Sequence, residues 1–220
     1  MTGGSGGMTG GSGGTTGPCT PGPDGALPLV VSSAFTPSGG MGDVGQIAMP
    51  DTDCPDRADG AAGACFVIDY DYDAGTAGED WAGVVWQHPA NNWDTMPGLC
   101  VAEGATNINF CARGEVGGEV VSFSGGEGTG TGDVTLGTEW TPYTISLSGV
   151  SYNTVTTSGG VVSGFVWAAP GRGPIRFYVD DIKWEASGPR ASCTSGTGGT
   201  GGSGGSGGTS GSGGSGGTSG

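Results

Sequence analysis

Short apolar or alternating runs, separated by Gly, Pro, Asp and Asn, fill the middle of this chain and constrain its fold more than any other feature. Helical periodicity is almost absent, whereas short runs rich in β-branched and aromatic side chains indicate strands. About nine such runs are found at residues 27–35, 44–49, 64–72, 80–87, 105–112, 118–124, 139–147, 161–168 and 174–185. This spacing predicts an all-β domain, an antiparallel β-sandwich or barrel. The glycine-rich stretch 125–133 is acidic, has no lysine and leads to another strand, so we expect a hairpin loop there rather than a phosphate loop.

The two ends of the chain differ in composition from its middle. Residues 1–17 are Gly, Ser and Thr apart from two methionines, and residues 194–220 are Gly, Ser and Thr only. Such segments have no apolar groups to offset the entropy of ordering, so both are predicted to be flexible linkers. A single β-sandwich domain is therefore predicted over residues 18–193, and the flanking linkers suggest a fragment of a longer protein.

The charge of the chain is strongly acidic, with 21 acidic residues against 6 basic ones and a net charge of −15. Such a field repels a phosphate backbone and an anionic membrane surface, so nucleic-acid binding is not expected. No apolar run is long enough to span a bilayer, and membrane insertion is not expected either. The acidity is read mainly as a source of solubility, with cation binding at specific clusters as the second interpretation.

Six cysteines and a single histidine, without a CxxC motif, favour disulfides over zinc. Disulfides imply an extracytoplasmic compartment, so the domain is expected to be extracellular or at the cell surface. Two pairs would each close a local loop, and the third would join the outermost cysteines if the first and last strands are antiparallel neighbours. The predicted pairs are Cys19–Cys193, Cys54–Cys65 and Cys100–Cys111.

The run FYVDDIKWE at residues 177–185 carries two adjacent aspartates inside an apolar strand. With regular alternation neither face of this strand would be apolar. One extra residue bulged out at Asp180–Asp181 would place Phe177, Val179, Ile182 and Trp184 on a common face. The sequence therefore predicts a β-bulge with two carboxylates at the kink.

The strand pattern and several of these motifs resemble a known family. The strand pattern, the tryptophan-rich middle and the terminal FYVDDIKWE look like jelly-roll carbohydrate-binding modules of the galactose-binding-like class. The segments WAGVVWQHPANNW and PGLCVAEGATNINFCARGEVGGEVVSF are similar to glycan-binding-like domains of bacterial secreted proteins with Gly/Ser/Thr-rich linkers. The resemblance covers residues 27–185 and implies a jelly-roll sandwich that binds carbohydrate.

The resemblance also implies a structural calcium ion, because acidic side chains of the last strand often help to bind one in these modules. Asp180 and Asp181 are the candidate ligands, since calcium takes six to eight oxygens in irregular geometry. The competing interpretation is that the two carboxylates are solvated or pair with Arg176 or Lys183.

A second acidic cluster places Asp69, Asp71 and Asp73 at alternate positions of the run VIDYDYDAG. With strand alternation these aspartates share one face, opposite a face of Phe66, Ile68 and the tyrosines between them. An exposed acidic face is the favoured interpretation. The alternative is that these carboxylates hydrogen-bond sugar hydroxyls.

Binding is better supported than catalysis. The one histidine, His88, precedes a proline, no serine has a nucleophile-elbow context, and no carboxylate pair is singled out by its spacing. The chain is therefore predicted not to be an enzyme.

Six tryptophans exceed what the core of such a domain needs, and sugar recognition requires aromatic rings beside amides and carboxylates. Trp93 is the first choice for stacking because it lies in a loop, although it could also cover the core. Trp81 and Trp86 are an odd number of positions apart, so only one of them can face a ligand. The predicted ligand-binding residues are Trp81, Trp86, Gln87, His88, Asn91, Asn92 and Trp93.

We therefore predict a non-catalytic polysaccharide-binding domain, monomeric within a longer extracytoplasmic chain. The alternative is a structural spacer or adhesin-like surface domain without a specific glycan ligand. It explains the linkers, the disulfides and the acidity equally well.

Overall fold

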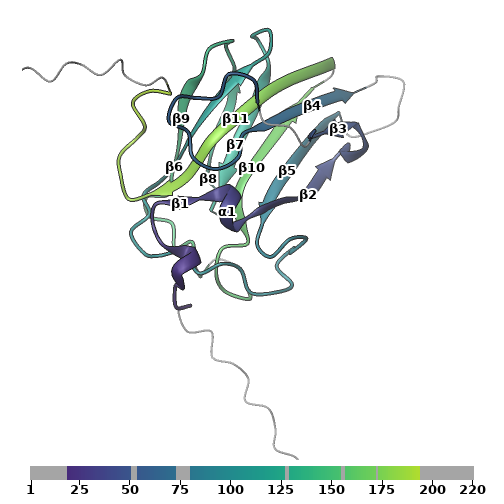
Figure 1. Cartoon of the computed structure of the whole chain (residues 1–220). Helices are drawn as coiled ribbons and strands as arrows, with labels where there is room; N and C mark the ends of the chain where they lie inside the picture. The colour runs from purple at the N-terminus through teal and green to yellow at the C-terminus, as the bar shows by residue number, and fades with distance from the viewer. Residues whose placement is uncertain are drawn as a thin grey trace, which may run out of the picture.

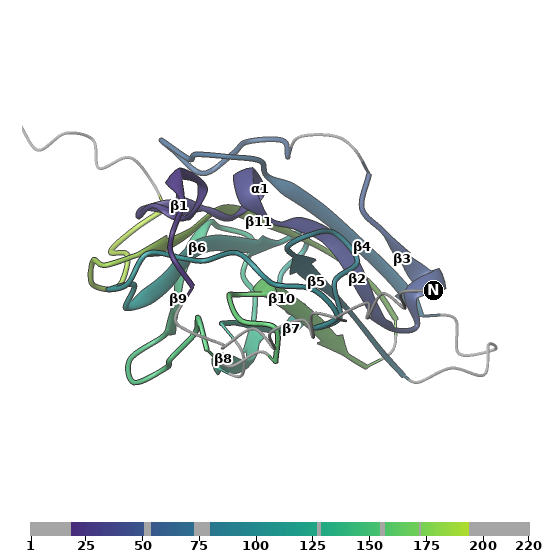
Figure 2. The same cartoon turned by 90° about the horizontal axis from the view of Figure 1, so that it is seen from below.

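The computed structural model describes residues 19–50, 54–72, 80–126, 129–154, 157–171 and 173–193. These residues form two antiparallel sheets packed face to face, a jelly-roll β-sandwich as the sequence predicts (Figure 1). Figure 2 shows the sheet of β5, β10, β7 and β8 as the layer beneath β4, β11 and β6. The predicted linkers 1–17 and 194–220 lie outside the described residues.

Eleven strands make up the two sheets within the described part of the chain. Sheet A has the order β3 (Ile47–Ala48), β4 (Phe66–Tyr72), β11 (Gly173–Glu185), β6 (Asn107–Gly114) and β9 (Thr141–Ser146), and β1 (Leu29–Val30) pairs with β11 beside β4. Sheet B has the order β2 (Thr36–Gly42), β5 (Trp81–Gln87), β10 (Ser163–Pro170), β7 (Val120–Gly125) and β8 (Thr129–Thr135). Two single turns of 3-10 helix, Pro23–Gly25 and Val44–Gln46, lie outside the sheets.

Aromatic rings from both sheets fill the space between the layers. Phe110 of sheet A packs edge to face against Phe123 and Phe165 of sheet B, with ring centroids 4.8 and 5.1 Å apart. Trp167 meets Phe177 in the same way at 5.2 Å. All five rings are buried, and edge-to-face contacts add to the free energy of burying them. This shared core fixes the sheets relative to each other.

The predicted bulge in β11 is present. The register between β11 and β6 shifts between Asp180 and Lys183, and Asp181 adopts a left-handed φ of 53°. The residues on either side of the bulge are buried in one core cluster, namely Phe177, Val179, Ile182 and Trp184. Both aspartates therefore lie at the kink, on the outer side of sheet A, as the alternation argument requires.

Two segments differ from the predicted strand pattern. The apolar run 27–35 is not one strand, because only Leu29–Val30 pairs with β11 and Val31–Ala34 forms a single helical turn, α1. This turn takes the chain from sheet A into β2 of sheet B. A continuous strand could not have paired both with β11 in sheet A and with β5 in sheet B. The glycine-rich stretch 125–133 is mostly strand rather than loop, because residues from Thr129 onward pair with β7 as β8.

All six cysteines form disulfides, but only Cys54–Cys65 has the predicted pairing. The predictions Cys19–Cys193 and Cys100–Cys111 are wrong, because the bonds are Cys19–Cys100 and Cys111–Cys193. The premise of the Cys19–Cys193 prediction was correct, since β1 and β11 are antiparallel neighbours. The two cysteines lie outside these strands, Cys19 before β1 and Cys193 after β11. Both of these outer segments turn away from the direction of the strand that they adjoin.

Before β1 the chain lies along residues 100–102, because Gly25 accepts a hydrogen bond from the Ala102 amide at 2.8 Å. A Cβ at Gly25 would lie 1.9 Å from the Cys100 carbonyl oxygen, so only glycine permits this approach. After β11 the chain folds back over sheet A, where the backbone amide of Asp59 donates to the Cys193 carbonyl at 3.1 Å. This return brings Cys193 to the outer side of β6, where Cys111 lies.

No helix in the described residues is long and apolar enough to cross a membrane.

Candidate functional site

The loop that follows β5 is organised around the side chain of Asn92, which is fully buried. Its Nδ2 donates to the carbonyls of His88 and Met96 at 3.0 and 2.9 Å, and its Oδ1 accepts from the amides of Thr95 and Met96. Gln87, also buried, donates to the Asn92 carbonyl at 2.9 Å. These bonds satisfy the backbone groups of the turn, so the loop has a defined shape.

Trp93 projects from this loop, and 53% of its surface is exposed. The residue before it, Asn92, is anchored inside the loop, and the carboxylate of Asp94 after it accepts from the amides of Thr157 and Ser158 at 3.0 and 3.4 Å. The Thr157 amide, with Ser158 as a further donor, lowers the pKa of Asp94, so this tie holds at neutral pH and is lost only in acid. Trp93 is therefore an exposed ring on a loop fixed on both sides. It is not a lid over the core.

The loop sits against the outer face of sheet B. Alternation along β5 places Ala82, Val84 and Trp86 in the core and the odd-numbered residues on the opposite face. Gln87 is on that outer face and bonds both to the loop and to Ser38 of β2, whose hydroxyl lies 3.0 Å from Gln87 Oε1. Ser38 also accepts from the Asn91 amide at 2.8 Å. These contacts place the Trp93 loop at the end of this face.

Small side chains form the middle of the same outer face. Gly83 pairs with Ala168 of β10, and Ala168 pairs with Ser122 of β7. One step along, Val85 pairs with Val166, and Val166 pairs with Ser124. The positions contributed by β10 and β7 are half-buried rather than covered. A ligand can therefore approach the backbone of β10 and β7 closely.

Trp81 marks the other end of this face. It is half-buried, shares the outer side of β5 with Gly83, and pairs with Pro170 at the end of β10. Gln87 is six positions further along the strand, which amounts to about 20 Å. The outer face of sheet B thus has small residues in its middle and a tryptophan near each end. We call this surface the sheet B face.

The structure places the predicted ligand-binding residues in three groups. Trp93 and Asn91 are exposed, and Trp81 and His88 are half-buried. Trp86, Gln87 and Asn92 are buried, so their side chains are not exposed to a ligand in this structure, and Trp86 is the member of the Trp81/Trp86 pair that the alternation places in the core. Trp86 packs in the core, whereas the side chains of Gln87 and Asn92 hydrogen-bond within the loop. His88 is also engaged, because its Nδ1 lies 2.7 Å from the Ala34 carbonyl.

The serines and small residues of the sheet B face were not predicted from the sequence. Their signal was available in the spacing, since Ser122 and Ser124 alternate with the apolar Val121 and Phe123. The sequence did not show that β10 lies beside these serines, or that β5 lies beside β10. Met96, which is also exposed near Trp93, was likewise not singled out.

The first of the two bulge carboxylates, Asp180, is fully buried and forms an ion pair with Arg57. Arg57 Nη2 lies 2.7 Å from Oδ1, and its Nε donates to Oδ2 at 3.2 Å. The amides of Asp181 and Ala58 donate to Oδ1 and Oδ2 at 2.8 and 3.1 Å. Both oxygens of Asp180 therefore accept one charged and one backbone donor.

The second carboxylate, Asp181, is 1% exposed and meets two cations. Lys183 Nζ lies 2.7 Å from Oδ1, which also accepts from the Ala62 amide at 2.7 Å. Arg190 pairs with Oδ2. Of the two interpretations that competed with calcium, solvation is wrong, whereas the pairing with Lys183 is confirmed and is joined by two arginines. Arg176 pairs with Asp69 instead.

These contacts do not fit a calcium site. All four oxygens of the aspartate pair already accept donors, and a calcium ion would have to replace two guanidinium groups and one ammonium group. In the described residues no group of three or more His, Cys, Asp or Glu side chains is arranged to hold a metal ion. Calcium binding at Asp180 and Asp181 stays a prediction, and the surrounding cations argue against it.

Chelation distinguishes these possibilities. With three cations holding the aspartate pair, we expect EDTA and added calcium to leave the melting temperature unchanged. A ligand that binds only the folded state stabilises it by mass action, so a fall in melting temperature with EDTA, restored by calcium, would show that a calcium ion binds the fold.

Asp69 and Asp71 on β4 follow the predicted alternation of buried and outer residues. Ile68 and Tyr70 are buried in the core, whereas Asp69 is half-buried and Asp71 is exposed on the outer side. Asp73 lies outside the described residues. The acidic face is therefore confirmed for two of its three members.

Comparisons with known proteins give structural matches only. No protein-family model and no curated protein matches the chain. A crystal structure of a family 30 carbohydrate-binding module matches with a TM-score of 0.46 and 15% identity, over 74% of this chain and 88% of that chain. The family 11 carbohydrate-binding module of the cellulosomal cellulase Lic26A-Cel5E of Clostridium thermocellum matches with a TM-score of 0.44 and 15% identity, over 73% and 94%. A family 11 module from the same organism, in complex with a β-1,3-1,4-mixed-linked tetrasaccharide, matches with 0.42 and 16%, over 69% and 90%. Because these scores are below 0.5, the function of this chain has to be argued from its own surface.

Proposed function

We propose that this chain is a non-catalytic carbohydrate-binding domain that binds a polysaccharide on its sheet B face. The observation that carries the proposal is Trp93, an exposed indole on a loop fixed by Asn92 and Asp94. A rigid exposed ring loses little entropy when a ligand stacks on it, and sugar rings offer apolar C–H faces for such stacking. Nothing in the packing of the core requires this ring at the surface.

The extended shape of the face supports a chain ligand rather than a single sugar. Trp93 and Trp81 lie near opposite ends of β5, and small side chains lie between them. Backbone approach and the hydroxyls of Ser122 and Ser124 supply hydrogen-bond partners for sugar hydroxyls along the way. A polysaccharide that runs along this face from Trp81 to Trp93 passes beside the small residues of β10 and β7.

The domain acts by binding and does not supply catalysis. His88 is held between the Ala34 carbonyl and the ring of Phe35, whose centroid is 6.0 Å away, so it has a structural role. Three disulfides support an oxidising, extracytoplasmic location, where polysaccharides are accessible. We place the domain outside the cell as a polysaccharide-binding unit.

Affinity electrophoresis against soluble glucans, xylans and mannans tests the proposal. We expect retardation by at least one polysaccharide, and a loss of at least about tenfold in affinity for Trp93→Ala, as for a central aromatic contact. Trp93→Phe keeps a stacking surface and should retain most of the affinity. Val44→Ala removes an exposed apolar side chain elsewhere and is the matched control.

Trp81→Ala extends this test along the face. Because Trp81 lies about 20 Å from the end of β5 that carries the loop, its loss should weaken binding of long chains more than of short oligosaccharides. The spacer interpretation would be favoured if no polysaccharide retarded the domain, or if the Trp93→Ala variant were retarded as much as the native domain.

A further inference from the structure

The Trp93 loop lies against a second segment of the chain, residues 157–162, which leads directly into β10. Where the loop begins, the His88 amide donates to the Val162 carbonyl at 3.0 Å. Where it ends, Leu99 forms an antiparallel bridge to the same segment, with hydrogen bonds of 2.9 and 2.7 Å. Both ends of the loop are therefore fixed to this segment through backbone groups.

The tip of the loop is joined to the same segment by a side chain, that of Asp94. Its Oδ2 accepts from the Thr157 amide at 3.0 Å, and its Oδ1 accepts from the Ser158 amide at 3.4 Å. Asp94 itself is exposed and adopts a left-handed φ of 57°, a conformation that aspartate enters more readily than most residues. One carboxylate thus bridges two segments that are 63 positions apart.

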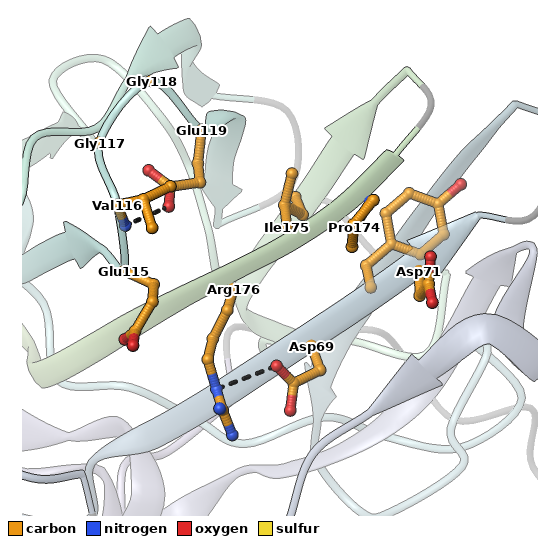
Figure 3. Close-up of a pocket in the computed structure, with 11 residues that line it drawn as sticks. Asp69, Asp71, Glu115, Val116, Gly117, Gly118, Glu119, Pro174, Ile175 and Arg176 are labelled. Atoms are coloured by element: carbon orange, nitrogen blue, oxygen red, sulfur yellow. Dashed lines mark hydrogen bonds and ion pairs between the residues drawn. The ribbon is translucent and has the colours of Figure 1, made fainter.

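Two carboxylates elsewhere in the domain show a different pattern. In the pocket lined by β4, β11 and the turn after β6, Arg176 of β11 pairs with Asp69 of the neighbouring strand at 3.0 Å (Figure 3). In the same pocket, Glu119 accepts from the Val116 amide of its own turn at 2.9 Å. These contacts tie a side chain to its own sheet or turn. The Asp94 contacts instead join two separate loops.

Asn92 and Asp94 have different roles in this arrangement. The side chain of Asn92 bonds to backbone groups of its own loop, so it sets the shape of the turn. Asp94 bonds outside the turn, so it sets where the turn lies relative to β10. β10 contributes Val166 and Ala168 to the middle of the sheet B face. The Asp94 carboxylate therefore links the exposed ring of Trp93 to the surface along which a polysaccharide would run.

We infer that Asp94 is a positioning residue, which holds the Trp93 ring in place at the end of the sheet B face and does not itself contact the polysaccharide. The inference rests on the proposed function, because it takes this ring as the surface on which a sugar stacks. A fixed ring is ready to stack, whereas a mobile ring must be ordered when the ligand binds, and this ordering weakens binding. Loss of the tie should therefore lower the affinity through Trp93 alone.

A double-mutant cycle tests this role by affinity electrophoresis with the polysaccharide that retards the native domain most. We expect Asp94→Ala to weaken binding about three- to tenfold, the cost of ordering one side chain. In the Trp93→Ala background the same substitution should weaken binding by less than about twofold, because the ring that it positions is gone. Asp94→Asn keeps an oxygen for the Thr157 amide and should retain most of the affinity.

Asp24→Ala is the matched control, because it removes an exposed acid elsewhere and should bind as the native domain does. Two results would overturn the inference. Native affinity in Asp94→Ala would show that the tie does not matter for binding. A loss that persists in full in the Trp93→Ala background would show that Asp94 contacts the ligand itself.

The mobility of the ring gives a second readout, which needs no ligand. The indole N–H resonance of Trp93 is identified by its absence in Trp93→Ala, and its heteronuclear NOE reports fast motion of the ring. We expect this NOE to fall in Asp94→Ala, while those of the buried Trp86 and Trp184 stay as in the native domain. If no polysaccharide retards the native domain, the proposed function fails, and the NOE still decides whether Asp94 holds the ring. An unchanged NOE would overturn the positioning role.

Discussion

Replacement of Asp180 by alanine is expected to destabilise the domain by about 3–5 kcal/mol, because it breaks a buried ion pair by removing one partner. Asp180 is fully buried and accepts four hydrogen bonds, two from Arg57 and two from backbone amides. Without it, the amides of Ala58 and Asp181 lose their acceptors, and Arg57 keeps a charge in a partly buried position. The bulge and the loop that covers it are therefore stabilised together.

Urea denaturation measures this loss, and melting should fall by about 10 °C for a chain of this size. Asp24→Asn is the control for the loss of one negative charge at an exposed site. In a double-mutant cycle, Arg57→Ala should cost much less in the Asp180→Ala background than in the native one. A loss below about 1 kcal/mol for Asp180→Ala, as for an exposed ion pair, would show that the buried charges are not coupled.

Removal of the Cys111–Cys193 disulfide is the second large effect that we expect. This bond joins residues 82 positions apart, so the chain-entropy treatment gives a stabilisation of about 4–5 kcal/mol. Cys54–Cys65 spans only 11 positions and gives about 3 kcal/mol on the same basis. The paired substitutions Cys111→Ser with Cys193→Ser should therefore destabilise the domain more than Cys54→Ser with Cys65→Ser.

The free energy of unfolding of the two double variants decides the order. Mapping of non-reduced peptides should first recover Cys19–Cys100 and Cys111–Cys193 as cross-linked fragments. Recovery of a Cys19–Cys193 fragment would contradict this connectivity. A smaller loss for the Cys111–Cys193 variant than for the local one would show that strain or residual structure outweighs chain entropy.

Local sequence patterns predicted the strand faces well. The position of the β11 bulge followed from four apolar residues around Asp180 and Asp181, because burial on one face leaves a single consistent register. The same logic placed Trp81 and Trp86 on opposite faces, and Trp86 is the one in the core. The loop position of Trp93 followed from the Pro, Asn and Gly around it.

Features that depend on segments far apart in the chain could not be predicted. Arg57 reaches Asp180 from a loop 123 positions earlier in the chain. Arg190 reaches Asp181 only because the chain folds back over sheet A after β11. The long disulfides depend on the direction of the chain outside the strands. The pocket lined by Asp69, Asp71, Glu115 and Glu119 joins β4 to a turn that follows β6, so only the two aspartates were noticed from the sequence.

The place of β11 in sheet A has a consequence for the order in which the domain can form during synthesis. β11 is the last strand of the chain, yet it lies between β4 and β6 and also pairs with β1 near the start. A nascent chain that ends before residue 173 has β3–β4 and β6–β9 as two separate pieces, with no strand to join them. Contacts at such long sequence separation form slowly. The sandwich is therefore completed only after its last strand has been made, and the Cys111–Cys193 bond closes after that.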